Sequence, residues 1–276
     1  MSDRSEFLTR LAAARREHCF PTDLRPRTQA FLQRTLALLF PHFAEGRGCA
    51  PESVASELDG AASALASLVH DIAGSDKASA SAYFMDALPG VWRTARQDAE
   101  ALLHSDPAAK SVDEVVLAYP GFYATICHRI AHVLHTAAVP ALPRLIAELA
   151  RERTGVDIHP GATIGRRFMI DHGSGVVIGE TAAIGNGVKL FQGVTIGALT
   201  VDKRSAGSKR HPTLGDHVVV YANATILGGD TVIGHDSVIA GNAFVTKSIP
   251  PFSLVDRHGE ARPRSDSGDF SVDFSI

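Results

Sequence analysis

Cysteine, excess charge of one sign and long apolar runs are all scarce in this sequence, and each absence excludes a class of protein. The 276 residues hold three cysteines, Cys19, Cys49 and Cys127, an odd number without metal-ligand spacing. This argues against a disulfide framework and favours a reducing compartment, the cytoplasm. With 30 acidic and 27 basic residues the formal charge is −3, so we expect neither nucleic acid nor an anionic membrane as a partner. No window approaches the ~18 uninterrupted apolar residues of a membrane span, and the first residues lack a signal-peptide core.

Helical spacing dominates the first half of the chain. Apolar residues recur there at three- and four-residue intervals, which predicts an all-α domain of about six to eight helices over residues 1–154. In the last of these helices, Pro143 lies near the start and Gly155 is a plausible C-cap. The periodic segments are residues 7–16, 28–40, 53–74, 90–104, 122–135 and 142–155.

A six-residue period replaces the helical spacing after about residue 155. A fixed period of six is the signature of a hexapeptide β-helix, in which three hexads make one triangular coil and the aliphatic side chains point inward. Glycine often follows the aliphatic residue, where we expect it to ease the turn conformation. The sequence therefore predicts an α+β protein whose residues 155–255 form a β-helix, usually left-handed in this repeat class. The aliphatic positions are Ile158, Ile164, Ile170, Ile178, Ile184, Leu190, Ile196, Leu214, Val220 and Ile226.

The period fails in three places. Eight residues separate Ile170 from Ile178, and Asp171 and His172 lie in this interval. A polar, basic segment, residues 197–213, has no hexad and ends in Arg210 and His211. After Ile226, either one residue is inserted before Ile233 or the inward register passes to Val232 and Val238. Insertions in repeat proteins collect on one face and often form the binding surface, so the polar residues at the first two breaks are candidate functional residues.

At this point the residues resemble a known family. The stretches "VDIHPGATIGRRFMIDHGSGVVIGETAAIG", "GVTIGA", "KRHPTLGDHVVVYANATILGG" and "VIAGNAFV" closely resemble the serine O-acetyltransferases, and a weaker match begins at "SDPAAKSVDEVV". The resemblance implies a helical domain followed by a left-handed β-helix, assembled as a homotrimer or a dimer of trimers with active sites between neighbouring β-helices. It also implies acetyl transfer from acetyl-CoA to the hydroxyl of L-serine, giving the cysteine precursor O-acetyl-L-serine.

The resemblance also implies roles for single residues. His172 matches the general base, a task that suits an imidazole near neutral pH. Asp157 of "VDIHP" matches the carboxylate that orients this base. Asp106 and Asp171 match positions that bind the serine ammonium. Arg210 and His211 match positions that bind the serine carboxylate and the reacting centre, and Glu180 matches a glutamate near the site. Ala198, Ala222 and Gly241 match positions that contact CoA through the backbone.

Other functions stay open at this point. Another hexapeptide acetyltransferase, acting on homoserine, a sugar or an antibiotic hydroxyl, would keep the base and acetyl-CoA without needing the Asp106, Asp171 and Arg210 set. A metal lyase of the γ-carbonic-anhydrase type would need three histidines around zinc, and "DHG" with "RHP" supplies two. His128, His132 and His135 share one helical face, but without cysteine or carboxylate ligands nearby we interpret them as packing residues and expect no metal.

The end of the chain departs from the family pattern. After "SIPPFSLV" the sequence becomes polar, and we expect residues 256–276 to form a flexible tail in place of the segment that usually helps to cover CoA. The terminal Ile276 nevertheless matches a family feature. Many members insert such a C-terminal isoleucine into the active site of O-acetylserine sulfhydrylase, and Phe274 would add a second anchor.

Overall fold

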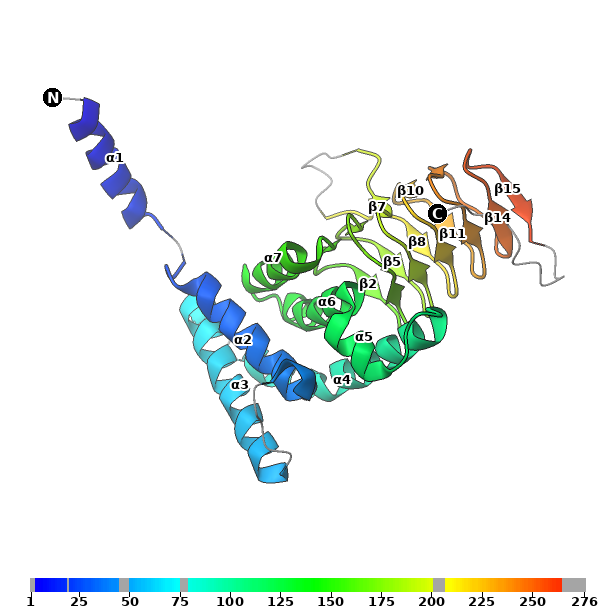
Figure 1. The fold of residues 1–276 in the computed structure, drawn as a ribbon. Helices are drawn as coiled ribbons and strands as arrows, with labels where there is room; N and C mark the ends of the chain where they lie inside the picture. The colour runs from blue at the N-terminus through cyan, green and yellow to red at the C-terminus, as the bar shows by residue number, and fades with distance from the viewer. Residues whose placement is uncertain (1–2, 19, 45–49, 75–78, 201–206, 265–276) are drawn as a thin grey trace.

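The chain folds into a helical region that leads into a stack of short parallel strands (Figure 1). The computed structural model describes residues 3–18, 20–44, 50–74, 79–200 and 207–264. Within these ranges, seven α-helices and one 3₁₀ helix precede the strands, which agrees with the predicted number. No helix of the described residues is both long enough and apolar enough to cross a membrane. The helices are α1 (Asp3–Arg16), α2 (Leu24–Leu39), η1 (Pro41–Phe43), α3 (Pro51–Ala73), α4 (Ser79–Ser105), α5 (Val112–Ala118), α6 (Pro120–Thr136) and α7 (Leu142–Thr154).

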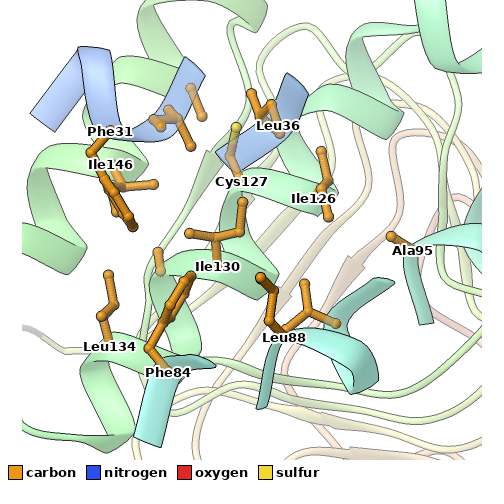
Figure 2. Close-up of a cluster of buried hydrophobic side chains, with 14 of the residues drawn as sticks. Phe31, Leu36, Phe84, Leu88, Ala95, Ile126, Cys127, Ile130, Leu134 and Ile146 are labelled. Carbon is orange, nitrogen blue, oxygen red and sulfur yellow. The ribbon is translucent and has the colours of Figure 1, made fainter. Parts of the chain in front are cut away.

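The helical core is built around α6, which is buried along most of its length. Phe31 of α2 meets Phe84 of α4 edge to face, with ring centroids 5.7 Å apart. Helix α6 contributes Ile126, Cys127 and Ile130 to the same buried cluster (Figure 2). Burial of each phenylalanine and isoleucine of this cluster stabilises the fold by about 1.5–3 kcal/mol. In contrast, α1 has no buried residue and projects away from the other helices (Figure 1).

Two helices differ from the sequence prediction. Helix α4 begins at Ser79, well before the predicted segment, and continues through Pro89 because Phe84 and Leu88 are buried against the core. Helix α5 was not predicted, since its seven residues are too few to show a period; Ser111 caps it by accepting a hydrogen bond from the Glu114 amide at 3.1 Å. The predicted C-cap is confirmed, because Gly155 ends α7 in the left-handed conformation with φ of 72°.

The strands form a left-handed parallel β-helix of three sheets. Sheet 1 has the order β1-β4-β7-β10-β13, sheet 2 has β11-β8-β5-β2, and sheet 3 has β15-β14-β12-β9-β6-β3. The parallel ladders of successive coils pair equivalent hexad positions, as in Ile158 with Ile178 and Ile178 with Ile196. The strands are β1 (Asp157–Ile158), β2 (Thr163–Ile164), β3 (Met169–Ile170), β4 (Val177–Ile178), β5 (Ala183–Ile184), β6 (Lys189–Leu190), β7 (Thr195–Gly197), β8 (Thr213–Leu214), β9 (Val219–Val220), β10 (Thr225–Leu227), β11 (Val232–Ile233), β12 (Val238–Ile239), β13 (Phe244–Val245), β14 (Ser253–Val255) and β15 (Ala261–Pro263).

Burial confirms the inward aliphatic positions and resolves the ambiguous register. The predicted aliphatic residues line the core of the coil, with only Ile164 partly exposed. After Ile226 one residue is inserted, because Ile233 and Ile239 are fully buried whereas Val232 is 45% exposed. Ile233 accordingly pairs with Leu214, and Ile239 with Val220.

The reason expected for the repeated glycines is wrong. The glycines that follow the aliphatic residues do not have positive φ. They are needed instead because the next coil leaves no room for a side chain: a Cβ on Gly165 would lie 2.6 Å from the Gly185 carbonyl oxygen, and one on Gly215 would lie 2.6 Å from the His235 nitrogen. Glycine at these corners therefore allows close stacking of the coils.

A buried polar contact fixes the first coil to the helices. Arg129 of α6 forms a double ion pair with Asp98 of α4, at 2.6 and 2.9 Å. The same guanidinium donates to the Gly165 carbonyl oxygen at 2.8 Å, and Asp98 accepts a hydrogen bond from the Phe168 amide at 3.0 Å. The chain between β2 and β3 is thus held from the helical side, immediately before Asp171 and His172.

The expectation of a flexible tail from residue 256 onward is wrong for its first part. Strand β15 pairs antiparallel with β14, in register Val255 with Ala261. Asp256 closes the turn between them by accepting hydrogen bonds from the amides of His258 and Glu260. Backbone pairing thus orders this polar segment without any apolar pattern. Phe274 and Ile276 lie outside the described residues.

Candidate active site

The predicted polar residues lie at two different corners of the triangular coil. Asp171 and His172 follow β3 and lead into β4, so they occupy the corner between sheets 3 and 1, called here the His172 corner. Glu180 follows β4, and Arg210 and His211 precede β8, so they occupy the corner between sheets 1 and 2, called here the Arg210 corner. The two corners therefore lie at opposite ends of the strands of sheet 1.

The irregularity at the His172 corner turns the imidazole outward. His172 is in the left-handed conformation with φ of 57°, and its side chain is 70% exposed. Gly173 follows with φ of 90°, and a Cβ there would lie 2.9 Å from side-chain atoms of both Ile170 and Val156. The backbone therefore packs tightly against the coil while the imidazole is free to contact a ligand.

Two carboxylates accompany this imidazole. Asp171 Oδ1 lies 4.0 Å from His172 Nε2. Asp106, from the segment after α4, accepts a 2.5 Å hydrogen bond from the Tyr119 hydroxyl and a 2.8 Å bond from the Ala108 amide. The Tyr119 and Ala108 bonds lower the pKa of Asp106, with smaller contributions from the positive charges of Lys189 and His172. Asp106, Asp171 and His172 are therefore brought together, and Asp106 is an anion at neutral pH.

Two residues at this corner were missed by sequence reasoning. Lys189 of β6 places Nζ 3.0 Å from Asp171 Oδ2. Tyr119, the residue before α6, binds Asp106, which raises the pKa of this phenol to about 12. The hexad pattern did not single out Lys189, because Asp171 lies on the neighbouring coil, where β3 pairs with β6, and not nearby in the sequence.

Asp157 is half-buried at the start of β1, where its backbone pairs with the next coil. Among the described residues no hydrogen bond joins its carboxylate to His172, whose closest acidic partner is Asp171. The orienting role of Asp157 therefore stays a prediction.

The Arg210 corner is fixed by a network around Thr181. The Thr181 hydroxyl accepts hydrogen bonds from the amides of Arg210 and His211, at 2.9 and 3.1 Å. The His211 ring in turn accepts from the Thr181 amide through Nδ1 at 3.1 Å, so its proton is on Nε2. Burial, with a contribution from the Arg210 charge, lowers the pKa of His211. His211 is therefore a neutral imidazole at neutral pH.

Arg210 and Glu180 form an ion pair at the same corner. The hydrogen bond from Arg210 is the main cause of the lowered pKa of Glu180. Only glycine fits at position 179, because the His211 ring lies against its backbone. A Cβ there would be 2.0 Å from Cδ2 of this ring. The corner presents a guanidinium whose counter-ion is already in place.

The positions matched to CoA are divided between the two corners. Ala222 and Gly241 lie on successive coils at the His172 corner, and a Cβ on Gly241 would be 3.2 Å from the Ala222 carbonyl oxygen. Ala198 follows β7 at the Arg210 corner. At the His172 corner, the buried Gln192 side-chain oxygen has no hydrogen-bond partner among the described residues.

The histidines on α6 pack against the first coil. His128 is 3% exposed, and burial lowers its pKa well below the usual value. His132 Nδ1 is 2.8 Å from the Pro160 carbonyl oxygen, and the His135 ring meets that of His159 edge to face. Within the described ranges, no three histidine, cysteine or acidic side chains are grouped so that they could hold a metal ion.

Although no family model matches the sequence, individual relatives agree with this architecture. A plasmid-encoded serine acetyltransferase of Synechococcus elongatus is 45% identical over 189 residues, covering 67% of this chain and 58% of the relative. The match thus spans less than two thirds of that relative's length. A serine acetyltransferase of Bacillus subtilis is 48% identical over 164 residues, covering 59% of this chain and 73% of the relative.

Solved structures extend the likeness over a larger share of the chain. Serine acetyltransferase 1 of Entamoeba histolytica in complex with L-cysteine has a TM-score of 0.76 at 35% identity, over 82% of this chain and 85% of that one. Soybean serine acetyltransferase complexed with serine has a TM-score of 0.60 at 31% identity, over 75% and 95% of the two chains. The chain belongs to the serine acetyltransferase family of acyltransferases.

Proposed function

We propose that this chain transfers the acetyl group of acetyl-CoA to the hydroxyl of L-serine, giving O-acetyl-L-serine in the first step of cysteine biosynthesis. The observation that carries the proposal is the pairing of chemistry at the two corners. One corner has an exposed imidazole beside two carboxylates, and the other has a guanidinium beside a neutral imidazole. L-serine has the complementary groups: a hydroxyl to be deprotonated, an ammonium and a carboxylate.

His172 is the general base of the proposed reaction. It takes the proton of the serine hydroxyl as the oxygen attacks the thioester carbonyl, so that a C–O bond forms without a covalent enzyme intermediate. A backbone N–H along the coil is the proposed donor to the tetrahedral oxyanion. When the C–S bond breaks, His172 returns its proton to the departing CoA thiolate. No metal has a role in this scheme.

The remaining polar residues bind the acceptor. Asp106 and Asp171 bind the serine ammonium, and Arg210 binds the carboxylate, for which a guanidinium offers a bidentate fork. His211 donates from Nε2 toward the reacting centre, and Glu180 holds Arg210 until the substrate carboxylate arrives. Asp157 orients His172 in the assembled enzyme. Ala198, Ala222 and Gly241 contact CoA through their backbones.

A complete site requires more than one copy of the chain. The His172 and Arg210 corners lie at opposite ends of the strands of sheet 1, so we infer that a single serine cannot reach both corners of one chain. We propose that the His172 corner of one copy faces the Arg210 corner of the next in a homotrimer, or a dimer of trimers.

The test is release of CoA thiol from acetyl-CoA with a panel of hydroxyl acceptors. L-serine should give the highest kcat/KM, ahead of homoserine, a hexose and an aminoglycoside antibiotic. A different preferred acceptor would replace serine by another hydroxyl substrate. Zinc in the purified protein, with carbon dioxide hydration and no acetyl transfer, would favour the lyase instead.

We further propose that Ile276 docks the chain onto O-acetylserine sulfhydrylase. The terminal carboxylate is able to mimic that of O-acetylserine, and burial of the isoleucine side chain would add about 1.5–3 kcal/mol. In a titration with the sulfhydrylase of the same organism, the full chain should bind, and a chain lacking Ile276 should bind at least tenfold more weakly. Equal binding of both chains, or of neither, would exclude the C-terminus as the docking element.

A further inference from the structure

Lys189 of β6 extends its ammonium to Asp171 at the His172 corner and has no role in the function proposed above. Its ammonium is 3.0 Å from Asp171 Oδ2 and donates to the Ser105 carbonyl oxygen at 3.4 Å. It also lies 4.5 Å from the centroid of the Phe191 ring, as a cation–π contact requires. Only 13% of the Lys189 side chain and 14% of that of Asp171 are exposed. Contacts on three sides therefore hold the ammonium in one place.

The charge of Lys189 changes the electrostatic balance of the corner. Asp171 uses Oδ2 to bind Lys189, while its Oδ1 faces His172 at 4.0 Å. Asp106 is the residue after Ser105, and its charge also interacts with Lys189. The two carboxylates thus share a single fixed ammonium, so about one negative charge is left for an acceptor to neutralise. Because the group is shielded from water, its effect is larger than that of a surface lysine.

We propose that Lys189 is a specificity-determining residue that moderates the preference of the site for acceptors carrying an amine. This inference rests on the proposed function, since it assigns the ammonium subsite to Asp106 and Asp171. With Lys189 in place, an acceptor without an amine leaves about one carboxylate unbalanced. Without Lys189 such an acceptor leaves both carboxylates without a counter-charge, whereas serine supplies an ammonium that binds between them. Lys189 therefore widens the range of acceptors, and its removal makes the site more selective for serine.

The experiment compares L-serine with 3-hydroxypropionate, which has the same hydroxyl and carboxylate but no amine. Binding of each to the full chain is measured by calorimetry, and kcat/KM by thiol release, for the wild type and for Lys189→Met, Lys189→Gln and Lys189→Arg. Gln retains a donor for the Ser105 carbonyl oxygen but has no charge, and Arg keeps the charge. Lys247→Met, at an exposed lysine on the coil, is the matched control.

The ratio of kcat/KM for serine to kcat/KM for 3-hydroxypropionate should rise about tenfold in both neutral variants, and so should the ratio of their association constants. It should stay within about threefold of wild type in Lys189→Arg and Lys247→Met, with KM for acetyl-CoA unchanged throughout. An unchanged or lower ratio in the neutral variants, or an equal rise in Lys189→Arg, would overturn the proposal. If wild type transfers acetyl to neither acceptor, the proposed function fails while the calorimetric ratio still decides the role of Lys189. Absence of binding of either acceptor to wild type and neutral variants would overturn both.

Discussion

At the scale of single residues, the two corners divide the proposed chemistry between a base and an anion-binding group. His172 owes its exposure to a two-residue break in the hexad and to its left-handed backbone. Arg210 and His211 owe their positions to Thr181, whose hydroxyl accepts both of their amides. The chemistry therefore depends on backbone irregularities that the remaining coil holds rigid.

Substitution of His172 tests the proposed base. His172→Ala should lower kcat by a factor of about a hundred or more with acetyl-CoA binding nearly intact, because general-base catalysis contributes about 10²–10⁴. Asp157→Asn should fold normally and lower kcat by a smaller factor. Steady-state kinetics with calorimetric titration of acetyl-CoA measures both effects. Near-normal turnover in His172→Ala would rule out this mechanism.

Substitution of Arg210 tests the carboxylate clamp. Arg210→Ala should raise KM for serine much more than KM for acetyl-CoA, because only serine offers a carboxylate to the guanidinium. Serine methyl ester and ethanolamine are the matched acceptors, and each should lose less kcat/KM than serine does. Equal losses with all acceptors would show that Arg210 holds the extruded segment, residues 197–213, rather than the substrate.

At the scale of elements, the contact between α6 and β3 couples the helices to the His172 corner. Gly121, at the start of α6, packs so closely that a Cβ would lie 2.0 Å from the Ile170 carbonyl oxygen, and Ile170 precedes Asp171. This backbone contact cannot be relieved by a rotamer change.

Two glycine-to-alanine substitutions, one at this contact and one as a control, test its role. Gly121→Ala should lower the free energy of unfolding by about 1–3 kcal/mol through overpacking, and should also lower kcat because Asp171 shifts with Ile170. Gly90→Ala, in α4, meets only the end of the Arg93 side chain at 4.0 Å and should instead stabilise the chain by about 0.5–1 kcal/mol. Urea denaturation measures both changes. Equal stability of the two variants would contradict the role given to Gly121.

At the scale of the whole molecule, the interface between the helices and the first coil contains histidines that folding keeps uncharged. Burial is the main cause that lowers the pKa of His159 to about 4. The unfolded chain, where a histidine has a pKa of about 6.5, binds a proton more readily than the folded chain. This residue therefore makes the folded state less stable as pH falls from about 6.5 to about 4, and has little further effect below that window.

The pH dependence of unfolding tests this interface. His159→Asn, which keeps an acceptor for the Gly161 amide, should lose stability less steeply than wild type between pH 6.5 and 4. His18→Asn, at an exposed position, is the control and should follow wild type. Urea midpoints at several pH values give the slopes, and coincident slopes for His159→Asn and wild type would refute the assignment.

The kinds of elements, and the places where polar residues interrupt them, followed from the amino-acid sequence alone. Periods of 3.6 and six residues are local properties of the chain, so they predicted the helical region, the inward aliphatic residues and the two breaks that contain His172 and Arg210. Local spacing does not show which corner a break occupies, because this depends on the summed lengths of all preceding turns. The folded coil placed His172 and Arg210 at opposite ends of the strands of sheet 1. Only the tertiary structure paired Lys189 with Asp171 on the neighbouring coil, and Asp98 with Arg129 between two helices. The partners of each pair are distant in sequence, so they meet only when coils and helices pack.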